Sequence, residues 1–200
     1  DFLSRPAEPA PFLGFSLMAN LLPFALLALR DVKARWPERT IILGGTGPKA
    51  VERKILERCP WVDVVAVGEG EIAAPLLIWT LKEGRGSRLA GAPSPYPLPQ
   101  GARVKSNPSL AAALADVPGV FCRHADGSVA ENPRAPRVRD LNSVPFPATE
   151  RIALKKYAGY GVMTSRGCPY KCTFCSVAPI WDRKSYSRSP ANIIAEMRRV

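Results

Sequence analysis

Histidine is almost absent from this sequence, since His124 is the only one in 200 residues. Cysteine is sparse as well, and three of the five cysteines lie within eight residues of one another. A small secreted protein held together by disulfides has more cysteines, spread along its chain. This distribution excludes a disulfide framework and favours a reducing, cytoplasmic setting.

The sequence also lacks a convincing membrane segment. Residues 11–29 form an uncharged stretch of nineteen residues, which is long enough to cross a bilayer. The stretch is broken by small, polar or helix-disfavouring residues, namely Gly14, Ser16, Asn20 and Pro23. A buried strand that continues into a helix explains it better. We therefore expect a soluble chain with no membrane partner and no signal peptide.

Acidic side chains are scarce in the last quarter of the chain. Residues 151–200 hold ten basic and two acidic side chains, so this quarter carries +8 of the formal net charge of +11. A basic surface can bind nucleic acid, but such interfaces usually add interleaved aromatic residues or a known motif, and neither is present. The charge is better explained by an anionic site or by further chain covering this surface, so we do not expect a nucleic-acid partner.

The first 83 residues alternate between short apolar runs and amphipathic segments. We expect strands over residues 12–18, 40–43 and 62–67, and helices over 21–36, 48–58 and 72–82, with Asn20 capping the first helix. Three strands that alternate with three helices in this way are typical of a parallel α/β sheet.

Small and polar residues follow each of these strands. Ser16 lies near the end of the first, Gly44 and Gly45 follow the second, and Gly68 and Glu69 follow the third. Ligands of parallel sheets bind beyond the carboxyl ends of the strands, and glycine lets a flat ligand touch backbone. The alternative is that the glycines only allow tight turns. Three such positions at one sheet edge favour a ligand site.

Residues 84–149 have a different composition. Residues 84–110 are rich in glycine, proline and serine and are predicted to form a linker. Residues 117–129 resemble a small hairpin that turns at Asp126-Gly127. Its strands contain Cys122 and His124, which we interpret as structural residues of a strand and of the hairpin surface.

The cysteine cluster has the spacing Cys168-x3-Cys172-x2-Cys175, and it falls between a strand predicted over residues 161–164 and a helix that starts at Ser189-Pro190. Three thiolates on so short a loop can converge on one polynuclear metal centre. An iron–sulfur cubane usually takes four cysteines, so three leave one iron with an open position. A zinc site is the alternative, but no fourth cysteine or histidine is near in sequence.

This cysteine pattern, with Phe174 before the third cysteine, resembles the signature of radical S-adenosylmethionine (radical SAM) enzymes. The resemblance implies that Cys168, Cys172 and Cys175 hold a 4Fe-4S cluster whose free iron chelates S-adenosyl-L-methionine, with Phe174 against its adenine side. In that family an electron from the cluster cleaves the sulfonium and yields a 5′-deoxyadenosyl radical. A small-molecule substrate and an electron donor are the implied partners.

The first domain resembles the cobalamin-binding domain that accompanies some radical SAM enzymes. The resemblance lies in Ser16-Leu17-Met18, in Gly44-Gly45 twenty-eight positions after Ser16, and in the segment Gly68 to Glu71. It implies that Ser16, Gly44 and Gly45, and with them Gly68 and Glu69, line a cobalamin pocket. The motif D-x-H-x-x-G, whose histidine would ligate cobalt, is absent. Its absence implies either a cofactor bound without a protein histidine or a missing N-terminal piece.

We therefore predict an α/β chain in three parts. Residues 1–83 would form a partial Rossmann-like (flavodoxin-like) cobalamin-binding domain, residues 84–149 a linker with a hairpin, and residues 150–200 the first β/α unit of a radical SAM TIM-like barrel. Such a start of a barrel cannot bury its apolar faces, so we expect residues 150–200 to be poorly packed or exposed, although Ile193, Ile194, Met197 and Val200 would form the inward stripe of the last helix.

The predicted function is that of an incomplete radical SAM enzyme. Its reaction would be methyl transfer to, or radical rearrangement of, an unactivated carbon. The alternative is a non-catalytic basic binding module whose cysteines hold zinc. A third possibility keeps the radical chemistry but treats the first domain as an architectural remnant without cobalamin.

Overall fold

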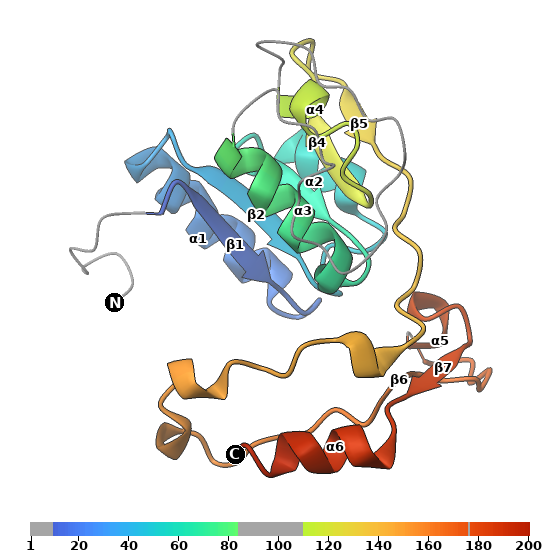
Figure 1. Ribbon diagram of the computed structural model, residues 1–200. Helices are drawn as coiled ribbons and strands as arrows, with labels where there is room; N and C mark the ends of the chain where they lie inside the picture. Colours follow the sequence, from blue (N-terminus) through green and yellow to red (C-terminus); the bar gives the residue numbers. More distant parts are fainter. Residues whose placement is uncertain (1–9, 84–109, 176) are drawn as a thin grey trace. The chain divides into compact units, whose positions relative to one another are not determined.

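The computed structural model describes residues 10–83, 110–175 and 177–200 (Figure 1). The chain forms two compact units, Asp1–Arg137 and Val138–Val200. Most of the segment predicted to be a linker, residues 84–109, lies outside the described residues. No helix within the described ranges is long and apolar enough to span a bilayer.

The first unit is built on a five-stranded sheet in the order β1-β2-β3-β4-β5. Its first three strands, β1 (Phe12–Ser16), β2 (Thr40–Gly44) and β3 (Val64–Ala66), run parallel to one another. Helices α1 (Leu22–Arg35), α2 (Glu52–Arg58) and α3 (Gly70–Glu83) follow these strands in turn. The predicted α/β class is confirmed, and the arrangement fits a Rossmann-like fold.

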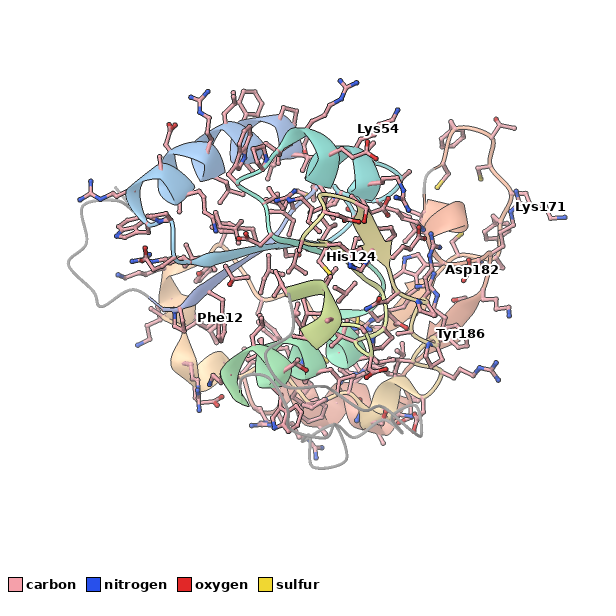
Figure 2. All side chains as sticks on the ribbon, turned by 90° about the horizontal axis from the view of Figure 1, so that it is seen from above. Phe12, Lys54, His124, Lys171, Asp182 and Tyr186 are labelled. Atoms are coloured by element: carbon pink, nitrogen blue, oxygen red, sulfur yellow. The ribbon has the colours of Figure 1, made fainter. Side chains whose placement is uncertain are left out.

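Helices cover both faces of the sheet, with α1 and α2 on one face and α3 on the other (Figures 1 and 2). Ile41, Leu43 and Val65 face α1 and α2, where they belong to one buried cluster with Leu29 and Leu56. Full burial of each such side chain contributes about 1.5–3 kcal/mol relative to exposure. Successive side chains of a strand point to opposite faces of the sheet. Because both faces are covered by helices, side chains on both are apolar, and the strand sequences are continuous apolar runs.

Two details of α1 and β1 differ from the prediction. The residue before α1 is Leu21, which makes no side-chain capping bond, so the predicted cap by Asn20 is wrong, while Pro23 lies in the first turn as expected. Strand β1 is parallel but lies at the edge of the sheet and is only partly buried, because β2 alone pairs with it. The predicted full burial of residues 12–18 is therefore wrong.

The predicted hairpin is confirmed and extends the sheet. Strands β4 (Val120–Arg123) and β5 (Val129–Glu131) pair antiparallel, and β4 pairs antiparallel with β3. The short helix α4 (Leu110–Ala113) precedes them. The Arg123 guanidinium donates to carbonyl oxygens at the end of α2 and just beyond it, which fastens the hairpin to the helix. The three predicted domain ranges stay a prediction, but this hairpin pairs with the strands of residues 1–83.

The second unit has little regular structure. Three short 3-10 helices, Leu141–Ser143, Thr149–Arg151 and Leu154–Lys156, precede a two-stranded antiparallel ribbon. The ribbon strands are β6 (Ser165–Gly167) and β7 (Ser185–Ser187), with the one-turn helix α5 (Val177–Ile180) between them. The strand predicted at residues 161–164 is therefore misplaced, because β6 begins at Ser165. The barrel unit stays a prediction.

The last helix, α6 (Pro190–Met197), starts as predicted, because the Ser189 side chain accepts a hydrogen bond from the Asn192 amide at 3.2 Å. Its predicted inward stripe is wrong: Ile194, Met197 and Val200 are 48%, 60% and 52% exposed. In the described part of residues 150–200 no apolar side chain is buried, whereas Arg188 and Glu196 are. The expectation of poor apolar packing here is confirmed.

Candidate functional site

The cysteine cluster lies on a loop whose two ends are held together by the ribbon. Strands β6 and β7 pair Ser165 with Ser187 and Gly167 with Ser185, so the chain leaves the ribbon at residue 168 and re-enters it at residue 185. Cys168 is the first residue of the loop, and Lys171 marks it in Figure 2. The cysteines are therefore presented from a closed loop.

The base of this loop depends on a glycine. Gly167 has a φ of +90°, and a Cβ atom there would clash with the carbonyl oxygen of Lys184 and lie 3.2 Å from the Trp181 Cβ. Across from it, Asp182 and Arg183 adopt positive φ values of 54° and 56°, and the Lys184 amide donates to the Trp181 carbonyl at 3.0 Å. These are the features of a type I′ turn. The side-chain-free position at 167 lets the turn pack directly on β6.

The three thiols of the loop are all free. Cys168 and Cys175 are partly buried and Cys172 is exposed. Within the described residues, no three His, Cys, Asp or Glu side chains converge on a position for one metal ion. A cubane binds its cysteines through separate irons, so the fit rests on the donor set: three unpaired thiols on one closed loop, which suit a cluster with one open iron.

Aromatic side chains on the same loop are strongly exposed. Phe174, one residue before Cys175, is 91% exposed, and Tyr170 is 71% exposed. A phenyl ring in water forgoes about 2 kcal/mol of burial free energy. The predicted adenine contact of Phe174 is not tested by the structure, which leaves the ring uncovered.

The predicted strand-end residues of the first unit come together at one edge of the sheet. Ser16 pairs in register with Gly44, and the next residue, Gly45, has a φ of +84°. A Cβ at Gly45 would lie 2.6 Å from the Leu17 carbonyl oxygen and 3.0 Å from the Ser16 Oγ. Gly45 is therefore required by the close approach of the segments after β1 and β2. The tight-turn alternative explains this glycine without a ligand.

Gly68 and Glu69 complete this edge. Gly44 lies beside the end of β3, since a Cβ at Gly44 would lie 3.7 Å from the Ala66 carbonyl oxygen. Gly68 follows Ala66 by two residues. Gly68 has a φ of +102° and open space where a Cβ would be, while Glu69 is buried. The edge thus combines a packed glycine at 45 with an open one at 68.

Cys122 lies in a strand and His124 on the hairpin surface, as expected, and Cys59 lies at a helix end. Cys59 ends α2, where burial raises the pKa of its thiol despite the nearby Arg123. Cys122 is buried in β4, and burial raises its pKa to about 11, again with partial compensation by Arg123. His124 is exposed in the hairpin (Figure 2). A thiol with a raised pKa is a poor nucleophile or metal ligand at neutral pH.

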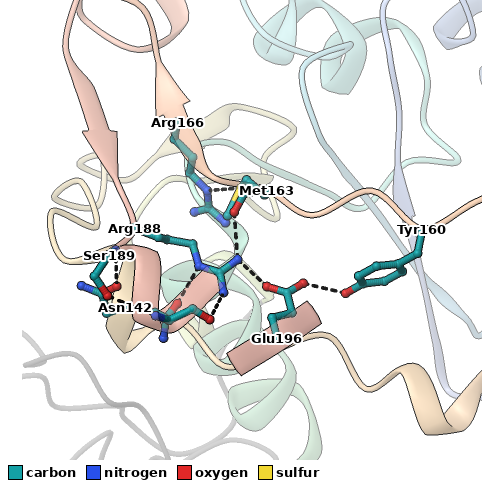
Figure 3. A network of polar contacts seen from close by, with 8 residues as sticks. Asn142, Tyr160, Met163, Arg166, Arg188, Ser189 and Glu196 are labelled. Atoms are coloured by element: carbon teal, nitrogen blue, oxygen red, sulfur yellow. Dashed lines mark hydrogen bonds and ion pairs between the residues drawn. The ribbon is translucent and has the colours of Figure 1, made fainter. Parts of the chain in front are cut away.

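Sequence reasoning missed a buried polar network in the second unit (Figure 3). The Arg188 guanidinium forms an ion pair with Glu196, and both side chains are 4% exposed. The Tyr160 hydroxyl donates to the Glu196 Oε1 at 2.6 Å. Burial acts to raise the pKa of the Glu196 carboxyl, but the bonds from Tyr160 and Arg188 outweigh it and lower the pKa. The hydrogen bond to Glu196 is the main cause that raises the pKa of Tyr160.

No family model matches the chain. It is 32% identical to the cobalamin-dependent radical SAM methyltransferase TokK of Streptomyces tokunonensis over 155 residues, which are 72% of this chain and 18% of that protein. The chain is related to cobalamin-dependent radical SAM methyltransferases.

Two further relatives are a methyltransferase and a cyclase by name. An uncharacterized methyltransferase of Pyrococcus horikoshii is 26% identical over 162 residues, which are 78% of this chain and 29% of that protein. The anaerobic magnesium-protoporphyrin IX monomethyl ester cyclase of Rubrivivax gelatinosus is 24% identical over 177 residues, 80% of this chain and 26% of that enzyme. The chain thus spans less than a third of the length of these relatives. The radical SAM resemblance is confirmed, with methyltransferases and a cyclase among the relatives.

Proposed function

We propose that this chain contains the cluster-binding loop of a radical SAM enzyme that also has a cobalamin-type domain. The observation that carries the proposal is the closed loop with three free thiols at Cys168, Cys172 and Cys175. The relatives of the chain are named as methyltransferases and as a cyclase. The reaction of the whole enzyme would be methyl transfer to an unactivated carbon of a small molecule, or its radical rearrangement.

The residues of the loop would have separate roles. The three thiolates would hold a 4Fe-4S cluster and leave one iron open for S-adenosyl-L-methionine. When bound, the cluster would supply the electron that cleaves the sulfonium. Phe174 would place its uncovered ring against the adenine, and this contact would bury a side chain that is 91% exposed. The basic residues around the loop, such as Lys171, would favour the negative charge of the thiolates and the cluster.

Cobalamin would bind at the carboxyl edge of the first unit's sheet. Ser16, Gly44 and Gly45 come together there, and the open position at Gly68 together with Glu69 extends the edge. The only histidine of the sequence is the exposed His124 of the hairpin. The cofactor would therefore be held without a histidine from this chain.

Anaerobic reconstitution with iron and sulfide tests the cluster proposal. We expect about four irons per chain in the unaltered protein and loss of this iron in Cys172→Ala. Cys59→Ala is the matched control, because Cys59 is also free but lies at the end of α2, and it should bind as much iron as the unaltered protein. Stoichiometric zinc with no iron uptake would instead support the zinc-binding module.

A further inference from the structure

One buried arginine lies at the point where both ends of the cysteine loop meet. Arg188 directly follows β7, and its backbone amide donates to the Thr164 carbonyl, just before β6, at 2.9 Å. Its guanidinium donates to the Met163 carbonyl at 2.8 Å. Arg188 therefore continues the pairing of the ribbon beyond its last residues, with its side chain as well as its backbone.

The same guanidinium binds the helix that follows the loop. Its Nε donates to the Asn192 Oδ1 at 2.6 Å, another nitrogen donates to the Asn192 carbonyl at 3.2 Å, and the ion pair with Glu196 completes the set. The Phe146 ring lies below it at 5.4 Å. Figure 3 shows these bonds radiating from Arg188. One side chain thus joins the chain before β6 to helix α6.

The chemistry of the side chain makes this arrangement specific for arginine. Burying a charge costs several kcal/mol unless the charge is paired and its hydrogen bonds are made. Arginine presents five N–H donors in a planar fork, whereas lysine has a compact ammonium that cannot reach the same partners together. The unit has almost no apolar core here, so this network takes the place of one.

We propose that Arg188 is a positioning residue for the cysteine loop, fixing the loop's two ends to each other and to α6 before any cluster binds. The inference rests on the proposed function, in which this loop holds a cluster. The bonds of Arg188 described above go to residues other than the cysteines. Its effect on them passes through β6, since Gly167 at the end of that strand is followed at once by Cys168.

Hydrogen exchange of the apo chain tests the clamp without a cluster. The variant Arg188→Met/Glu196→Gln removes both buried charges but keeps an oxygen acceptor for Tyr160, so no charge is left unpaired. We expect amides of β6 and β7 to exchange at least tenfold faster, while those of the first unit's sheet stay protected. Arg188→Lys should show an intermediate loss. Arg199→Met is the matched control, because Arg199 also lies 5.4 Å from Phe146 but is exposed, and it should leave the ribbon unchanged.

Iron uptake by the same variants connects the clamp to the cluster. We expect the double variant to take up iron at least threefold more slowly than Arg199→Met, while Cys172→Ala loses iron yet keeps the ribbon protected. Unchanged exchange in β6 and β7, or a loss spread over all of residues 138–200, would overturn the positioning role. If the unaltered chain takes up no iron, the proposed function fails, and the exchange data still decide the clamp.

Discussion

Gly167 and Lys184 face each other so closely that no side chain fits between them: a Cβ at Gly167 would lie under 3.0 Å from the Lys184 carbonyl oxygen. The contact joins the last residue of β6 to the turn that precedes β7. It sets the direction in which the chain enters Cys168.

Replacement of this glycine should open the base of the loop. In Gly167→Ala the methyl group meets a backbone carbonyl and the backbone must hold a positive φ, which together cost about 1–3 kcal/mol. We expect faster alkylation of the partly buried Cys168 by iodoacetamide, measured by mass spectrometry of the apo chain. Gly161→Ala is the matched control, because nothing lies within 4 Å of its Cβ position. Equal alkylation rates in both variants would show that the contact does not position Cys168.

The Arg188 network should stabilise the second unit only between an acidic and an alkaline pH limit. The pKa of Glu196 is lowered, so its stabilising contribution is present above the ordinary glutamate pKa of about 4.3 and is lost as the pH falls through the lowered value. The pKa of Tyr160 is raised, so its contribution is present below about 10 and is lost as the pH rises through the raised value.

Amide chemical shifts of α6, followed by NMR from pH 3 to pH 11, would measure both limits. Glu196→Gln should remove the acid transition and Tyr160→Phe the alkaline one. The interpretation fails if the acid transition is the same in Glu196→Gln as in the unaltered protein.

Cobalamin binding at the sheet edge should be sensitive to bulk at Ser16. Ser16 is exposed at the end of β1, so Ser16→Phe can be accommodated by the fold but would obstruct a flat cofactor. We expect at least a tenfold weaker equilibrium affinity for cobalamin. Ala34→Phe, at an exposed position on α1, is the control for added surface bulk. Failure of a longer chain that contains the first unit to retain cobalamin would favour the alternative in which this unit is an architectural remnant.

The parts of the fold that sequence could predict are those in which local pattern and packing agree. Ile41 to Leu43 read as a buried strand because both faces of β2 are covered by helices. The Asp126-Gly127 pair predicted the hairpin because Gly127 adopts a φ of +85° and Asp126 accepts bonds from Ser128. The serine before Pro190 predicted its helix through a local capping bond.

The parts that could not be predicted depend on contacts between distant segments. The stripe at Ile194, Met197 and Val200 has helical spacing, but spacing does not say whether another element covers it. Nothing in the charge pattern marks Arg188 and Glu196 as buried, since such residues are mostly exposed.

The same limit applies to the glycines of the sheet edge. Gly45 fits a ligand site by pattern, yet its position is filled by the backbone of Leu17. Sequence alone identifies that a side chain is excluded but not what excludes it. Gly68 shows the opposite case, with open space at its Cβ position.

The central claim is that Cys168, Cys172 and Cys175 hold a cluster with one open iron. Electron paramagnetic resonance of the reconstituted, reduced chain, with and without S-adenosyl-L-methionine, tests it most directly. We expect a cluster spectrum that changes when S-adenosyl-L-methionine is added and that is missing in Cys172→Ala. A cluster spectrum indifferent to S-adenosyl-L-methionine, or a chain that binds zinc and no iron, would contradict it.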